Sequence, residues 1–237
     1  MNKKILLIGN NHGRSGVPKD FINYISFFKD EIGGNWNNSE ILQVMNPAKD
    51  VLLETLDHLR VESLEFLIII YCGPTNQKRE SALEINKAGG CIDESDIRDI
   101  APRQITIYDC CQSVPGSSKR MESKKTTLKS SASESEIRTL YETRIEESIP
   151  QQVCLYACSI GQIAHDTTDG GEYSNYLLGV LRAIQTDYIS VRGAHELASL
   201  LTTNHYKDQV PEIVDTKCSP SEELILSINP RLKKALQ

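Results

Sequence analysis

Two adjacent cysteines follow a short apolar run that we expect to form a buried strand. The segment IYDCCQS places Asp109, Cys110 and Cys111 at the end of this run. A loop after a strand can expose a thiol and direct it at a substrate, so a nucleophilic cysteine would fit here. By chemistry alone the signal is weak, because such cysteines are more often inert small hydrophobic residues and a thiol needs an activating environment to react.

Strands and helices alternate along the chain and would position these residues. Short apolar runs predict six strands, at residues 5–9, 40–45, 64–72, 104–110, 152–158 and 210–215. The third run is apolar nearly throughout, which is typical of a central strand covered on both faces. Apolar residues spaced by three or four predict helices at residues 21–28, 52–59 and 176–184. The pattern favours an α/β fold with a largely parallel sheet, helices on both faces and a ligand site at the carboxyl ends of the strands.

Composition narrows the class of protein. The 237 residues are 39% hydrophobic with a formal net charge of -6, so no basic field favours nucleic acid. No run approaches the ~20 apolar residues that cross a bilayer, and the apolar run at the amino terminus is too short for a signal peptide. Seven cysteines, two of them adjacent, do not suggest a disulfide framework. We expect one domain, residues 1–237, in the cytoplasm.

One segment interrupts the alternation. Residues 114–136 are rich in Ser, Lys and Glu and nearly free of apolar residues. This composition predicts a flexible loop. The loop is either a solvated surface insertion or a segment with a processing or gating role.

Four segments, taken in order, resemble the caspase and metacaspase superfamily of cysteine peptidases. They are LLIGNNHGRSGVPKD, FLIIIYCGPT, IYDCCQS and LYACSIGQIAHDTTDGGEYSNYLL, and QVPEIVD is similar to the last strand of that family. The resemblance spans roughly residues 4–216. It implies a caspase-like three-layer sandwich with a central, mostly parallel six-stranded sheet.

The resemblance also assigns roles within IYDCCQS. The family's Asp-x-Cys-x-Ser motif puts the nucleophile at Cys111, with Cys110 as the spacer and Ser113 two residues after the nucleophile. Metacaspase-type members line the primary specificity pocket with two aspartates, which correspond here to Asp20 and Asp109.

Two buried carboxylates repel each other unless a cation lies between them. An Arg or Lys side chain of a substrate would supply that cation, and Arg would do so with two hydrogen bonds. The alternative is structural: Asp20 would cap a helix that begins near Phe21, and Asp109 would accept backbone hydrogen bonds.

Arg14 belongs to an Arg-Ser-Gly sequence that true caspases use to hold a substrate aspartate. An acidic pocket at Asp109 contradicts a preference for acidic substrates. We therefore favour basic substrates and treat Arg14 as a surface residue.

The chain departs from the family at its catalytic histidine. Where the family has Ser-Gly-His-Gly, this chain has Cys72, Gly73, Pro74 and Thr75, so Pro74 occupies the position of the base. Cys72 would border the substrate pocket, and the amides near Gly73 and Cys111 would form the oxyanion site. Proline cannot transfer a proton, and a thiol near its ordinary pKa of ~8.5 is mostly protonated at neutral pH.

Two other histidines lie in loops near the expected strand ends. His12 follows the first strand, and His165 precedes the Gly-Gly segment. Neither matches a base of the family, so each is expected to be a surface residue, with His12 the better substitute.

Two functions remain open. The first is a degenerate peptidase scaffold that binds a basic peptide segment or a protein partner with little or no hydrolysis. The second is an active cysteine endopeptidase that cleaves after Arg or Lys with Cys111 as nucleophile. We expect no cofactor, no metal site, and no nucleic-acid or membrane partner, since neither a nucleotide-binding glycine motif nor a Cys-x-x-Cys pair occurs.

Overall fold

The computed structural model describes residues 1–11, 16–74, 82–110 and 133–231. A central sheet contains six strands in the order β11-β7-β6-β3-β1-β2. All neighbouring pairs are parallel except β11 and β7, which are antiparallel. The strands are β1 (Lys3–Gly9), β2 (Ile41–Met45), β3 (Phe66–Gly73), β6 (Arg103–Cys110), β7 (Gln151–Tyr156) and β11 (Glu212–Asp215). All six strands that the sequence predicts are confirmed, to within a few residues at their ends.

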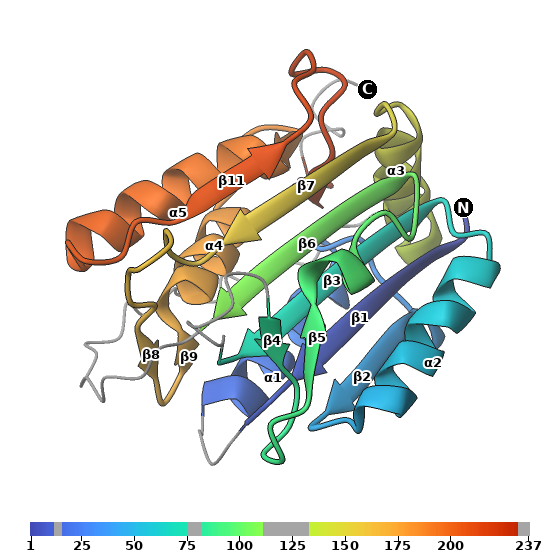
Figure 1. Ribbon diagram of the computed structural model, residues 1–237. Coiled ribbons are helices and arrows are strands. Elements are labelled where there is room, and N and C mark those ends of the chain that lie inside the picture. The colour runs from blue at the N-terminus through green and yellow to red at the C-terminus, as the bar shows by residue number, and fades with distance from the viewer. Residues whose placement is uncertain (12–15, 75–81, 111–132, 232–237) are drawn as a thin grey trace.

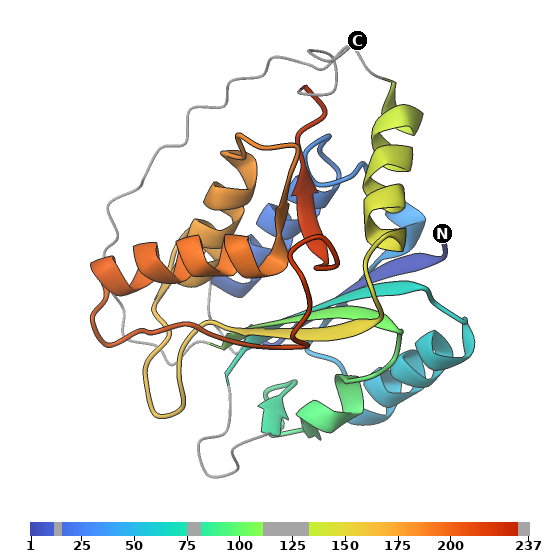
Figure 2. The ribbon, with the colours of Figure 1, turned by 90° about the horizontal axis from the view of Figure 1, so that it is seen from above.

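Helices cover both faces of the sheet, as Figure 2 shows. One face packs against four helices and a small antiparallel pair of strands; the elements are α1 (Gly16–Phe28), α3 (Glu134–Glu146), α4 (Glu172–Arg182), α5 (Val191–His205), β10 (Tyr188–Ser190) and β12 (Ile225–Ile228). The other face packs against α2 (Lys49–Val61), η2 (Glu94–Ile97), β4 (Ala82–Glu84) and β5 (Cys91–Asp93). The short strands β8 (Asp166–Thr167) and β9 (Gly170–Gly171) pair with each other, and η1 (Asn38–Glu40) precedes β2. The predicted three-layer α/β architecture is therefore confirmed.

Strand β3 is central because every one of its residues is buried. Alternate side chains enter different cores: Ile68 and Ile70 contribute to the core under α1 and α4, and Leu67 and Ile69 to the core over α2. Burial of each such side chain contributes about 1.5–3 kcal/mol to folding. The continuous apolar run thus explains the strand's place in the middle of the sheet.

The sequence pattern misplaces the end of the polar segment, and it predicts neither helices α3 and α5 nor the short strands outside the central sheet. Helix α3 begins at Glu134, inside the predicted loop at residues 114–136, because Ser133 and Glu136 form a capping box. The rest of that loop, residues 114–132, lies outside the described residues. Helix α5 and strand β12 had no prediction, although Ser190 caps α5 by accepting a hydrogen bond from the Gly193 amide.

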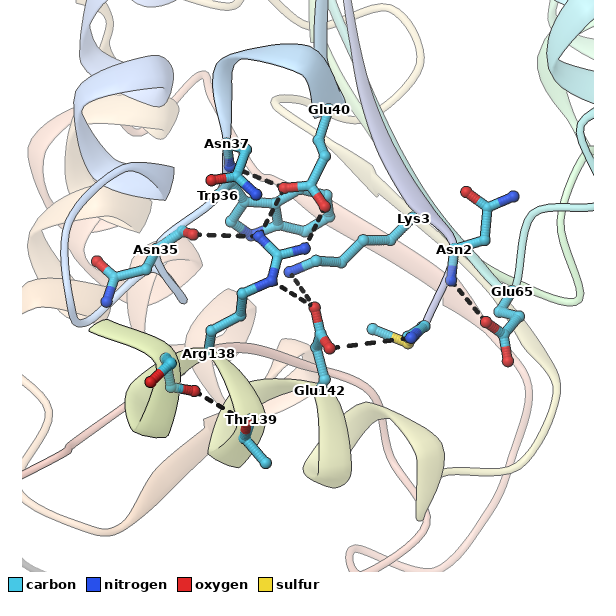
Figure 3. A network of polar contacts seen from close by, with 12 residues as sticks. Asn2, Lys3, Asn35, Trp36, Asn37, Glu40, Glu65, Arg138, Thr139 and Glu142 are labelled. Carbon is cyan, nitrogen blue, oxygen red and sulfur yellow. Dashed lines mark hydrogen bonds and ion pairs between the residues drawn. The ribbon is translucent and has the colours of Figure 1, made fainter. Parts of the chain in front are cut away.

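Helix α3 is attached to the start of β1 by an ionic network around the buried Lys3, whose other members are half-buried (Figure 3). Lys3 Nζ lies 3.3 Å from Glu142 Oε1 and 3.9 Å from the centre of the Trp36 ring. Arg138 Nε lies 3.0 Å from the same glutamate oxygen, and the Arg138 guanidinium also pairs with Glu40. This network joins the first strand to the segment that follows the 111–132 region.

None of the described helices combines the length and the apolar character that crossing a membrane requires.

Candidate functional site

Three side chains meet under helices α1 and α4, at the carboxyl ends of the two central strands. Cys72 on β3 and Asp109 on β6 are direct register partners, so their side chains point to the same face of the sheet. Asp20 reaches the same place from α1. A carboxylate oxygen of each aspartate and the Cys72 sulfur all lie within 4.8 Å of one another, and all three residues are buried. Figure 1 shows these strand ends beside α1 and the β8–β9 hairpin.

Helix α1 positions Asp20 by its periodicity. Val17, Asp20, Phe21, Tyr24 and Phe28 recur at intervals of three or four and form its buried face. Because α1 begins at Gly16, Asp20 lies within the helix, so the alternative that it caps a helix near Phe21 is wrong. Its carboxylate instead accepts a hydrogen bond of 2.9 Å from the Gly171 amide.

The Gly-Gly pair of β9 lies directly against the two carboxylates. A Cβ atom at Gly170 would overlap Asp20 Oδ1, and one at Gly171 would overlap both oxygens of Asp109. Gly170 also has a φ of +110°, a conformation that side chains other than glycine rarely adopt. Glycine is therefore required at both positions for the hairpin to approach the aspartates, which gives a physical reason for this part of the sequence motif.

Burial strongly disfavours the ionised forms of Asp20 and Asp109. Burial raises the pKa of Asp109 to about 7, and the nearby Asp166 carboxylate adds to the rise. Burial likewise raises the pKa of Asp20 well above its usual range, with the charges of Asp109 and Asp166 as further causes. Among the described residues neither aspartate has an ion-pair partner, and Oδ2 of each is buried without a hydrogen bond.

One hydrogen-bond chain partly compensates Asp109. Its carboxylate interacts with the Ser174 hydroxyl, which lowers the pKa and so opposes the effect of burial. The Ser174 oxygen lies 2.6 Å from the Tyr24 hydroxyl oxygen. Since an ionised carboxylate only accepts, Ser174 donates to Asp109 and Tyr24 donates to Ser174 when Asp109 carries its charge.

Asp166 is a member of the site that the sequence analysis did not identify. It belongs to β8, and its carboxylate lies against Gly16 at the start of α1, so closely that a Cβ atom there would overlap it. The amino terminus of a helix attracts a negative charge, which favours this location. The sequence signal that could have identified Asp166 is its position four residues before the Gly-Gly pair.

The turn after β3 has a defined shape and carries no imidazole. Pro74 is buried, and its carbonyl oxygen accepts hydrogen bonds from the Tyr71 hydroxyl at 2.5 Å and from the Glu84 amide at 3.3 Å. Gly73 is required here as well, because a Cβ atom would lie 2.9 Å from the Tyr71 hydroxyl oxygen. The described structure thus places Gly73 and Pro74 in the last part of β3 and the turn that follows it.

The remaining residues of the expected site divide into two groups. Cys111, Ser113, Arg14 and His12 lie outside the described residues. His165 is described and is engaged elsewhere: its Nε2 lies 3.1 Å from Asp208 Oδ1, and its ring stacks on Tyr206 at a centroid distance of 4.0 Å. These contacts tie His165 to the loop between α5 and β11.

This strand order, with one antiparallel edge strand and helices on both faces, defines a caspase-like α/β fold. Comparisons with solved structures support the same class. The chain matches the Drosophila initiator caspase Dronc with a TM-score of 0.58 and 16% identity, over 97% of this chain and 84% of Dronc. It also matches a protein from Geobacter sulfurreducens, known from a structural genomics crystal structure, with a TM-score of 0.56 and 13% identity, over 97% of this chain and 98% of the other.

Sequence comparisons add nothing to the structural ones. No protein-family model matches the chain, and no curated protein matches it. At 13–16% identity the two structural matches establish the fold alone.

Proposed function

We propose that this chain is a degenerate caspase-like peptidase domain that binds a basic segment of a peptide or protein partner with little or no hydrolysis. The observation that carries the proposal is the buried pair Asp20 and Asp109, which has no cation among the described residues. Two ionised carboxylates in such surroundings are stable only with a positive charge between them. An Arg side chain would supply the charge and satisfy both unbonded Oδ2 atoms.

The proline at the position of the family's base supports the non-hydrolytic half of the proposal. Pro74 stands where the family has its histidine, and the hydrogen bonds to its carbonyl hold the turn in place. His165 is paired with Asp208 and packed on Tyr206. Without an imidazole to accept its proton, a thiol at position 111 would lose a contribution of about 10²- to 10⁴-fold in rate.

Binding of matched peptides tests the proposal. Fluorescence anisotropy would compare labelled peptides that differ at one position, with Arg, its neutral analogue citrulline, or Asp. A desolvated charge pair contributes about 2–5 kcal/mol, so Arg should bind at least ~10-fold more tightly than citrulline. Asp20→Asn and Asp109→Asn should each remove most of the difference, whereas Asp57→Asn, on the exposed side of α2, should leave it intact.

Equal affinity for the Arg and citrulline peptides would contradict the proposal. A preference for the Asp peptide would contradict it too and would assign the pocket to Arg14.

A second candidate is an active cysteine endopeptidase with Cys111 as nucleophile and Arg or Lys at the cleaved position. The match to Dronc over nearly the whole chain favours it, because Dronc is itself a caspase. Hydrolysis of the Arg peptide by the unmodified protein, abolished by Cys111→Ala, would support this candidate over the first.

A further inference from the structure

The cluster under α1 and α4 contains donors of two chemical kinds. Asp20 and Asp109 offer carboxylate oxygens, and Cys72 offers a sulfur, with all three donor atoms within 4.8 Å of one another. Oδ2 of each aspartate is fully enclosed and has no hydrogen-bond partner among the described residues. These two oxygens are independent signs of a missing positive group, because buried polar atoms are seldom left unbonded.

From this geometry we infer that the Asp20–Cys72–Asp109 cluster is a binding site for a divalent metal ion of the zinc type. Zinc accepts thiolate sulfur at about 2.3 Å and carboxylate oxygen at about 2.0–2.2 Å, so donors around one ion lie about 3.3–3.8 Å apart. All three donor atoms already lie within 4.8 Å of one another, so only a small closing movement separates them from that spacing. Calcium and magnesium are disfavoured because they select oxygen donors alone.

Charge favours the same class of ion. The two carboxylates neutralise a dication, and the third carboxylate, Asp166, adds negative potential at both of them. A bound metal replaces the protons that these acids otherwise hold, and it also promotes loss of the Cys72 proton. Three protein ligands leave a fourth position for water or for a group from a partner.

The pocket wall explains how an ion would be retained. The Gly170–Gly171 strand lies directly on both carboxylates, and the Gly171 amide already donates to Asp20. The β8–β9 hairpin has only two residues in each strand, so it is the part of the wall that can move to admit an ion. Metal and Arg side chain would occupy the same two carboxylates and therefore exclude each other.

Cadmium titration tests the site, because Cd²⁺ bound to a thiolate gives an ultraviolet charge-transfer band. The 237-residue protein should show a saturable band with one equivalent of Cd²⁺, and Zn²⁺ should compete for it. Cys72→Ser should abolish the band, and Asp20→Asn and Asp109→Asn should weaken Cd²⁺ binding at least ~10-fold. Cys154→Ser, which alters a buried strand cysteine of the other core, should keep both band and affinity.

A band that survives in Cys72→Ser, or a Cd²⁺ affinity unchanged by both aspartate variants, would overturn the site. Circular dichroism would verify the fold of each variant, and if Cys72→Ser does not fold, the two shape-conserving Asn variants decide the question. The metal site does not depend on peptide binding. If the protein binds cadmium but not the Arg peptide, the metal site stands and the proposed function is wrong. If it binds the Arg peptide but not cadmium, only the metal site is wrong.

Discussion

The central sheet buries charged groups at both of its ends, and the two clusters are built differently. At the amino end of β1, Lys3 and Arg138 are interleaved with Glu40 and Glu142, and the Lys3 ammonium also lies over the Trp36 ring (Figure 3). At the carboxyl ends of β3 and β6, carboxylates lie beside one another without a cation among the described residues.

The difference separates a structural cluster from a candidate binding site. In the Lys3 network each charge has a partner of opposite sign, so the network joins β1 to α3 without a ligand. The aspartate pair costs free energy unless protons or a bound cation neutralise it. A cationic partner, as proposed above, would offset this cost.

The largest expected effect concerns Pro74, in the turn that follows β3. If the carboxyl end of the sheet retains its peptidase geometry, Pro74→His combined with Thr75→Gly should raise hydrolysis of an Arg peptide about 10²- to 10⁴-fold, or about 3–5 kcal/mol in the barrier. A fluorogenic Arg substrate measures the gain. Adding Cys111→Ala should remove it, because the imidazole would then have no thiol to activate.

Vigorous turnover by the unmodified protein would contradict the degenerate assignment. The absence of any gain in the folded double variant would contradict an intact peptidase geometry around position 74.

The next effect is expected at the opposite end of the sheet. Glu142→Gln leaves the Lys3 ammonium buried without its anion, so the free energy of unfolding should fall by about 3 kcal/mol. Urea denaturation measures this loss. Glu146→Gln, on the exposed side of the same helix, should change stability by no more than about 0.5 kcal/mol. Equal effects of the two substitutions would mean that the Lys3 network does not stabilise the attachment of α3.

Removing a charge from the aspartate pair should instead increase the free energy of unfolding. At pH 8 Asp109→Asn removes a buried anion that repels its neighbours, so the free energy of unfolding should rise by about 1–3 kcal/mol. The matched Asp57→Asn variant on the surface should show no such gain. A loss of stability in Asp109→Asn would contradict a net cost of the buried Asp109 carboxylate.

The pH dependence of stability should distinguish the two ends. The pKa of Asp109 is raised from 3.8 to about 7, so the folded protein binds more protons between these values and its stability falls as the pH rises through that range. The slope is up to about 1.4 kcal/mol per pH unit. Asp109→Asn should flatten it.

Lys3 makes stability change with pH in the opposite direction, over a different pH range. Burial lowers the pKa of Lys3 to about 8, so between about 8 and 10.5 the folded state binds fewer protons and this group favours folding more as the pH rises. Urea denaturation across both windows measures the two slopes. An unchanged slope between pH 4 and 7 in Asp109→Asn would contradict the raised pKa of that aspartate.

The sequence predicted the fold more fully than the site. Six apolar runs and the unbroken run of β3 were enough for the strands and the layers, since their periodicity reports directly on burial. Helix α5 was missed because Leu197 and Leu200 are half exposed, which obscures its amphipathic pattern. The start of α3 was missed because a short capping signal lies within a polar segment.

The site depended on tertiary contacts that no spacing reveals. The resemblance placed Asp20 and Asp109 in one pocket, but Asp166 joins them only through the return of the β8–β9 hairpin. The contact of Gly170 and Gly171 with the carboxylates joins residues about 60 to 150 positions apart in sequence. The role assigned to Cys111 stays a prediction, because that residue lies outside the described part of the chain.

Proton release on peptide binding tests the central claim, that the aspartate pair is a pocket for a cationic side chain. Calorimetric titration of the Arg peptide at pH 6.5, in buffers with different heats of ionisation, measures the protons released. A guanidinium that pairs with Asp109 must ionise a carboxyl group whose pKa is about 7, so this carboxyl group should release about 0.8 proton at pH 6.5, and Asp109→Asn should lower the total release by about that amount. Binding of the Arg peptide without proton release, or with equal release in the Asp109→Asn variant, would contradict the account.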